Sequence, residues 1–149
     1  MRTGFTFILM LVLTGVLAQQ KSVEEYVEMK ASKLASKSPF EKIIDRELPA
    51  TIVYENDYVI AFKPLKNQAP VHYLIVPKKR INTVNEVTEA DVMTLGHLFL
   101  AAKVVAEKMG VAESGYRLVV NTNRDAGQSE FHVHMHLLGG AYVGPMVNN

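Results

Sequence analysis

A run in which histidine alternates with apolar residues, from Phe131 to Leu138, restricts the local fold strongly. His132, His134 and His136 stand at every second position, and the residues between them are apolar. Successive side chains of a β-strand point to opposite faces of the sheet. The pattern therefore predicts a strand that turns its apolar side chains to the core and its three imidazoles to one shared face.

Three imidazoles on one face point to chemistry, because an ordinary solvent face carries Lys, Glu, Thr or Ser instead. Each protonated ring disfavours protonation of its neighbours, so at least one should be neutral near pH 7. A neutral imidazole can serve as a nucleophile, a general base or a zinc ligand. A zinc site remains open as an alternative, although the chain has no Cys and the nearby carboxylates are Asp125 and Glu130.

The segment before this strand, residues 121–129, reads NTNRDAGQS and is rich in neutral donors. Gly127 permits close approach of the backbone to a ligand, and Asn121, Gln128 and Ser129 offer amide or hydroxyl groups. Neutral donors that lead into imidazoles suit an anion better than a cation, so the segment predicts a phosphate site.

The other periodicities predict an α+β domain with a mostly antiparallel sheet and one long helix packed on it. Strands are expected at 52–55, 59–62, 72–76, 116–121 and 131–138, and Asn56-Asp57 marks a hairpin turn. His72 opens the third strand, where it either joins the imidazole cluster or is a partly buried structural residue. His97 is predicted to be structural.

The long helix is expected at 89–109, with Thr88 as its N-cap and Gly110 just after its end. Its predicted apolar face comprises Val92, Leu95, Phe99, Ala102, Ala106 and Met109, widened by Leu98 and Val105. A face this wide predicts two partners, the sheet and a second subunit.

Residues 1–18 predict a secretory signal peptide, with Arg2, an apolar run over 5–17 and small residues near Ala18. That run is shorter than the ~20 residues of a stable membrane span. Entry into the secretory pathway or secretion is therefore expected, with a membrane-anchored or organellar protein as the alternative. Residues 19–38 predict a linker or marginal helix before a single domain over 39–149.

Composition narrows the classes of partner. The 16 basic and 15 acidic residues leave a net charge of +1, which gives no long-range attraction to nucleic acid. A hydrophobic content of 48% is enough for a packed core.

The sequence HVHMHLL follows the pattern His-φ-His-φ-His-φ-φ, where φ is apolar. Three longer stretches extend the match: PFEKIIDRELPATIVYENDYVIAF, NQAPVHYLIVPKKRI and GYRLVVNTNRDAGQSEFHVHMHLLGG. From Ser38 to Gly140 the chain resembles the Hint branch of the histidine triad (HIT) superfamily, the nucleoside phosphoramidases. The resemblance implies the HIT fold, a homodimer formed through the 89–109 helix, and hydrolysis of the P–N bond of nucleoside 5′-phosphoramidates through a nucleotidyl-histidine. It implies no metal and no cofactor.

The resemblance also implies roles for single residues. His134 would attack the phosphorus, supported by His132, His136, His72 and Ser129. The nucleotide-binding residues would be Asn121, Gly127, Gln128 and Ser129 toward phosphate or ribose, and Phe40, Ile43 and Leu65 around the purine base.

Two departures from the family pattern bear on function. Pro64 stands where the family usually carries an acidic residue that accepts the ribose hydroxyls, and the C-terminal AYVGPMVNN lacks a Trp-containing tail. Lys63 or Lys66 could compensate by contacting phosphate. The lost carboxylate motivates a different class of protein, a module that binds a phosphorylated ligand or nucleotide with little turnover. A dinucleoside polyphosphate hydrolase is a further alternative.

Overall fold

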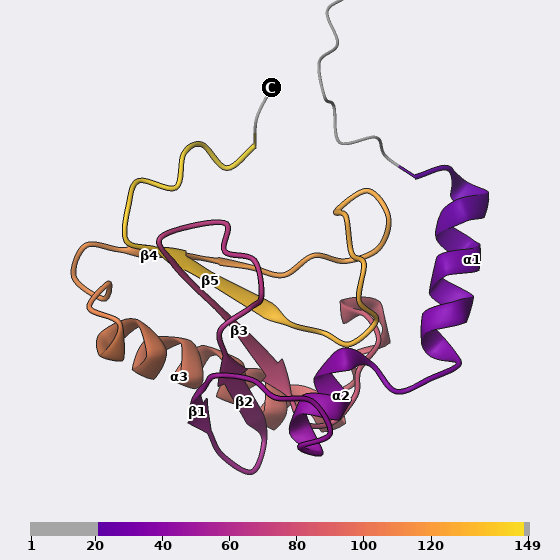
Figure 1. The fold of residues 1–149 in the computed structure, drawn as a ribbon, viewed down its shortest axis with the longest axis horizontal. Helices are drawn as coiled ribbons and strands as arrows, with labels where there is room; N and C mark the ends of the chain where they lie inside the picture. Colours follow the sequence, from indigo (N-terminus) through magenta and orange to yellow (C-terminus); the bar gives the residue numbers. More distant parts are fainter. Residues whose placement is uncertain (1–20, 148–149) are drawn as a thin grey trace, which may run out of the picture.

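The computed structural model describes residues 21–147, and it confirms the predicted α+β class (Figure 1). The strands are β1 (Ile52–Glu55), β2 (Val59–Phe62), β3 (Val71–Pro77), β4 (Tyr116–Val119) and β5 (Met135–Gly139). The helices are α1 (Val23–Leu34), α2 (Pro39–Ile44) and α3 (Val92–Lys108), with short 3-10 turns at Val84–Glu86 and Glu89–Asp91.

The strands of the described part form one antiparallel sheet in the order β1-β2-β3-β5-β4. β5, the last strand in the chain, therefore lies beside β3. Their register pairs His72 with Leu138 and Leu74 with His136. Because paired and diagonal side chains share a face, His72 and His136 come close together.

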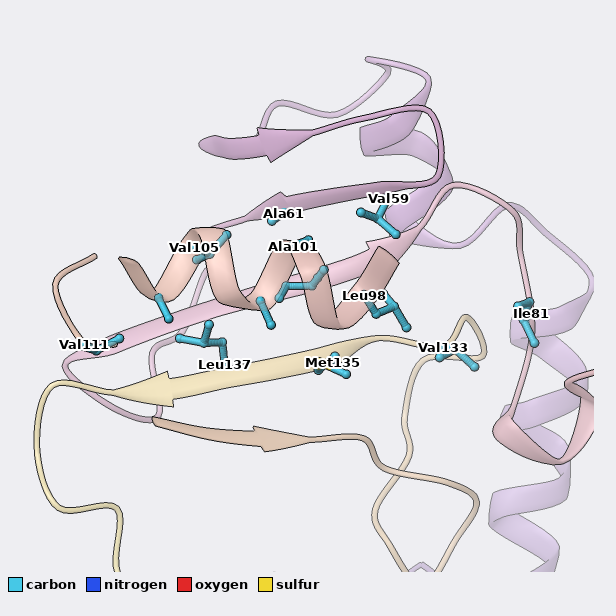
Figure 2. Close-up of a cluster of buried hydrophobic side chains, with 13 residues drawn as sticks. Val59, Ala61, Ile81, Leu98, Ala101, Val105, Val111, Val133, Met135 and Leu137 are labelled. Carbon is cyan, nitrogen blue, oxygen red and sulfur yellow. The ribbon is translucent and has the colours of Figure 1, made fainter. Parts of the chain in front are cut away.

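Different helices cover the two faces of the sheet. Val59 and Ala61 belong to a large core beneath α3, whereas Ile60 and Phe62 pack with Phe40 of α2. The core beneath α3, shown in Figure 2, comprises Val59, Ala61, Ile75, Ile81, Leu98, Ala101, Ala102, Val105, Ala106, Val111, Val133, Met135 and Leu137. This alternation leaves the α2 face for the histidines.

The C-terminal signal of the long helix is confirmed, but the predicted N-cap is wrong: Thr88 precedes the 3-10 turn Glu89–Asp91, and Asp91 is the N-cap of α3. The backbone N–H and the hydroxyl of Thr88 both donate to Asp91, each at 2.9 Å. Gly110 has φ +71°, a conformation that glycine adopts without steric cost.

The predicted apolar face of this helix is partly wrong. Val92 and Phe99 are 65% and 60% exposed, while Leu98 and Val105 lie at the centre of the buried face with three alanines. Small side chains let α3 approach the sheet closely, which sets the rotation of the helix about its axis. The apolar residues left exposed are Val92, Met93, Phe99, Leu100 and Val104.

The histidine strand begins later than predicted, at Met135 instead of Phe131. The pairing of β5 with β3 stops at Ile75 and Met135, and its pairing with β4 stops at Val119 and His136. His132 and His134 thus precede the regular ladder. The Val133 N–H donates instead to the Ile81 carbonyl at 2.6 Å.

Within the segment 19–38, for which a linker or a marginal helix is predicted, residues Val23–Leu34 form α1, a capped helix that docks on the domain. Ser22 and Glu25 form a capping box, and Tyr26 is buried against the Phe131 ring. Figure 1 shows α1 beside the connection between β4 and β5. The predicted signal peptide lies outside the described residues and stays a prediction. No helix within residues 21–147 is long and apolar enough to cross a membrane.

Candidate active site

Four histidines gather on the α2 face of the sheet. The ring centroids of His134 and His136 are 5.0 Å apart, and those of His72 and His136 are 5.2 Å apart. The Phe40 ring from α2 lies 5.0 Å from His134. The predicted joining of His72 to the cluster therefore occurs. Val133, Met135 and Leu137 lie in the core beneath α3, so His134 and His136, which alternate with them, lie on the opposite face.

His134 has one free ring nitrogen. Its Nδ1 lies 2.9 Å from the His132 carbonyl oxygen, which can only accept, so Nδ1 carries the proton. Burial lowers the pKa of His134, and the ring is 8% exposed. His134 is thus neutral near pH 7 and keeps an unshared electron pair on Nε2.

His132, in contrast, has both ring nitrogens engaged and is fully buried. Nε2 donates to the Pro77 carbonyl at 2.7 Å, and Nδ1 accepts from the Ser38 hydroxyl at 3.0 Å. Ser38 is also the N-cap of α2, where its Oγ accepts the Glu41 N–H. The geometry makes His132 a support for the site and for the carbonyl that holds His134.

His72 fixes the protonation pattern of His136. The Gln68 N–H donates to Nδ1 of His72 at 3.1 Å, so His72 carries its proton on Nε2. That nitrogen lies 3.0 Å from Nδ1 of His136, which therefore accepts. His136 keeps its proton on Nε2. Burial and the neighbouring imidazoles lower its pKa to about 4.

These histidines should make the protein less stable in mild acid. Burial lowers the pKa of His72, His132 and His134 below 6.5 as well, so the unfolded chain binds more protons than the folded one as pH falls below that value. The free energy of unfolding should therefore decrease between about pH 7 and about pH 5.5. Urea titrations at both pH values measure this, and an unchanged or higher midpoint in acid would contradict it.

One side chain holds the donor loop together. The Gln128 side chain accepts the Asn123 N–H and donates to the Asn82 and Glu130 carbonyls, at 2.8, 2.8 and 3.1 Å. Gln128 is 3% exposed and its side-chain amide is engaged on both atoms, so it braces the loop; the phosphate contact from Gln128 stays a prediction. Ser129 is exposed and Asn121 is half-buried. Gly127 has φ +72°, as a tight loop requires.

The predicted base-binding residues come together only in part. Phe40 and Ile43 share a cluster, but Leu65 is 104% exposed and lies outside it. Leu65 follows Pro64 in an irregular segment after β2, where no ladder holds it against α2. Phe62 packs against Phe40 in this cluster, with ring centroids 5.8 Å apart.

Sequence reasoning missed Ser38, Phe62 and the Pro77 carbonyl. A signal existed for Ser38, because Ser followed three residues later by Glu41 is a capping-box pattern. Within residues 21–147, no group of three His, Asp or Glu side chains is placed to hold a metal ion.

This chain is similar to several known proteins in sequence and fold. The HIT domain family matches residues 45–142. The purine nucleoside phosphoramidase of Escherichia coli K12 is 49% identical over 114 residues, which cover 76% of this chain and 96% of that protein. A solved HIT family hydrolase from Clostridium thermocellum is 49% identical with a TM-score of 0.73, covering 76% of this chain and 98% of that one. One from Legionella pneumophila is 44% identical with a TM-score of 0.70, covering 72% and 96%.

Proposed function

Since this chain belongs to the HIT domain family, we propose that it is a hydrolase that cleaves the P–N bond of purine nucleoside 5′-phosphoramidates without a metal or cofactor. One observation carries the proposal. The bond from Nδ1 of His134 to the His132 carbonyl leaves Nε2 of a neutral, buried imidazole free to attack. The 49% identity to a purine nucleoside phosphoramidase supports the choice of substrate.

In the first step, Nε2 of His134 forms a bond to the α-phosphorus while the P–N bond breaks. The electron pair of the P–N bond leaves with the amine, which takes up a proton; we assign Ser129 and His136 as the donors to the departing nitrogen. The imidazole becomes cationic, and the His132 carbonyl stabilises it through the bond to Nδ1. Water then attacks phosphorus and gives a proton back to the group that protonated the amine. The bond between phosphorus and Nε2 breaks with its electron pair on Nε2, so the nucleoside monophosphate leaves and neutral His134 returns.

Release of AMP from adenosine 5′-phosphoramidate tests the function. Residues 19–149 should turn this substrate over equally well with and without a chelator, and a quenched reaction should contain a peptide adenylylated at His134. A folded protein that releases no AMP would contradict the proposal. Tight AMP binding without turnover would favour the binding module. Faster cleavage of diadenosine polyphosphates than of adenosine 5′-phosphoramidate would favour a dinucleoside polyphosphate hydrolase.

Ribose recognition should be weak, because Pro64 has no acceptor for the ribose hydroxyls. Pro64 is half-buried two residues after the end of β2, and Lys63 between them is exposed and its ammonium only donates. Pro64→Asp should lower KM for adenosine 5′-phosphoramidate by roughly tenfold through charge-assisted hydrogen bonds. Steady-state kinetics measure this. Asn67→Asp, which adds the same charge to the same segment, is the control, and an equal change in both variants would contradict the prediction.

We also propose a homodimer formed through the exposed apolar side of α3. Five apolar residues remain exposed there, and Phe99 is 60% exposed. Such a patch is typical of an interface. Sedimentation should show a dimer for the wild type and a monomer for Phe99→Asp. Val23→Asp, at a 54% exposed valine of α1, should remain dimeric. A wild-type monomer would contradict the proposal.

A further inference from the structure

The segment from Gln128 to Val133 leads into His134 and includes His132. It precedes β5, so the hydrogen bonds of the regular ladder do not hold it in place. Its position depends on bonds to residues 80–82. The Gln128 amide donates to the Asn82 carbonyl at 2.8 Å, and the Val133 N–H donates to the Ile81 carbonyl at 2.6 Å. Arg80 Nε donates to the Phe131 carbonyl at 3.1 Å, on the peptide unit that joins Phe131 to His132.

Arg80 connects this segment to the N-terminal helices. Its guanidinium donates to the Ser36 carbonyl at 2.8 Å and to the Lys33 carbonyl at 3.2 Å, at the end of α1. It also donates to the Glu41 carboxylate of α2 at 2.9 Å. One rigid, planar group thus joins α1, α2 and the residue before His132.

α1 contacts the same segment directly. The Tyr26 ring meets the Phe131 ring edge-on, with centroids 5.8 Å apart, and the Lys30 ammonium lies 5.4 Å from the Phe131 centroid. Lys33 forms an ion pair with Glu130. Phe131 is 1% exposed, so the side chain next to His132 is fixed on one side by α1.

An open pocket of about 230 Å³ lies between α1, α2 and the segment over part of this junction, lined in part by Ser36, Lys42, Glu130 and Phe131. The link from α1 to the histidines therefore rests on the contacts of Tyr26, Lys33 and Arg80. The HIT domain match begins at residue 45, so α1 lies before the matched residues.

We propose that α1 is a positioning element of this protein, which holds Glu130 and Phe131 through Tyr26, Lys33 and Arg80 and thereby sets His132 and His134. The activity readout rests on the proposed function. Small displacements of a nucleophile lower the rate of the chemical step more than they lower binding. A defect in this link should consequently appear in kcat.

The test compares neighbouring residues of α1 in the full chain. Tyr26→Ala should lower kcat for adenosine 5′-phosphoramidate by about tenfold. Tyr26→Phe should match the wild type, because the Tyr26 hydroxyl is buried without a hydrogen-bond partner among the described residues. Val27→Ala, at a 57% exposed position, should also match it. Equal kcat in Tyr26→Ala and the wild type, or an equal fall in Val27→Ala, overturns the proposal.

A second pair of variants guards against loss of folding in Tyr26→Ala. Lys33→Met breaks the pair with Glu130 at a partly exposed position and should lower kcat by about threefold. Lys37→Met breaks pairs with Asp45 and Glu47, which do not belong to the segment, and should leave kcat unchanged. An equal kcat in the two variants overturns the proposal.

Imidazole ¹⁵N spectra test the inference without any substrate. The hydrogen bonds predict a proton on Nδ1 of His134 and on Nε2 of His132. Tyr26→Ala should shift or broaden these signals, whereas Val27→Ala should leave them in place. If the wild type releases no AMP, the proposed function fails while the spectra still decide the inference; unchanged spectra in Tyr26→Ala overturn it.

Discussion

Replacing His134 with alanine should reduce AMP release from adenosine 5′-phosphoramidate by at least about a thousandfold, with the fold intact. The variant removes the ring whose Nε2 is free, and no neighbour can replace it. His132 has both nitrogens engaged. His136 accepts through Nδ1 and holds its proton on Nε2, so it presents no free electron pair. Single-turnover kinetics measure the loss.

His97→Ala is the matched control, because this histidine lies outside the cluster. Its ring stacks on Tyr58 with centroids 4.1 Å apart, and its Nδ1 pairs with the Asn56 amide. Turnover should stay within about twofold of the wild type, as for a substitution that leaves the site untouched. Activity of His134→Ala close to that of His97→Ala would show that the nucleophile is another group.

Leu137→Ala should lower the free energy of unfolding by about 2–5 kcal/mol. Leu137 is fully buried in the core beneath α3, although it stands directly beside His136 in the sequence. Removing its side chain leaves a cavity between the sheet and α3 that close-packed neighbours fill only in part. Urea unfolding followed by circular dichroism measures the change.

Leu65→Ala makes the same substitution at a position that is 104% exposed, and its effect should stay within about 0.5 kcal/mol. The folded Leu137→Ala protein should keep most of its kcat, since Leu137 points away from the histidine face. Similar midpoints for the two variants would mean that the core beneath α3 does not stabilise the domain as its burial indicates.

Local sequence signals were sufficient to predict the structure where a single residue preference or a simple alternation decided it. Gly110 marked the C-terminal end of the long helix, and the alternation around His134 and His136 assigned the two faces of β5. The α3 face was harder, since apolar residues surround that helix and periodicity cannot rank Phe99 against Leu98. Close packing of alanines against the sheet decided the rotation.

Contacts between distant segments decide how the remaining site residues are placed. The side-chain amide of Gln128 could donate either to a ligand or to a backbone carbonyl. In the structure it donates to the Asn82 carbonyl, 46 residues away in the sequence. Leu65 matched the family pattern, but an irregular segment leaves it exposed. Pairing of His72 with His136 required the β3–β5 neighbourhood, which no local pattern specifies.

The Ser38 hydroxyl joins two local structures into one cooperative unit. Its oxygen accepts the Glu41 N–H that starts α2, and its proton goes to Nδ1 of His132. When the first turn of α2 frays, the His132 ring therefore loses the hydrogen bond from Ser38 at the same time. In native-state hydrogen exchange, the amides of α2 and those around His132 should open together, with one shared free energy. A molecule that has lost this helix turn has also lost the hydrogen bond that orients the His132 ring.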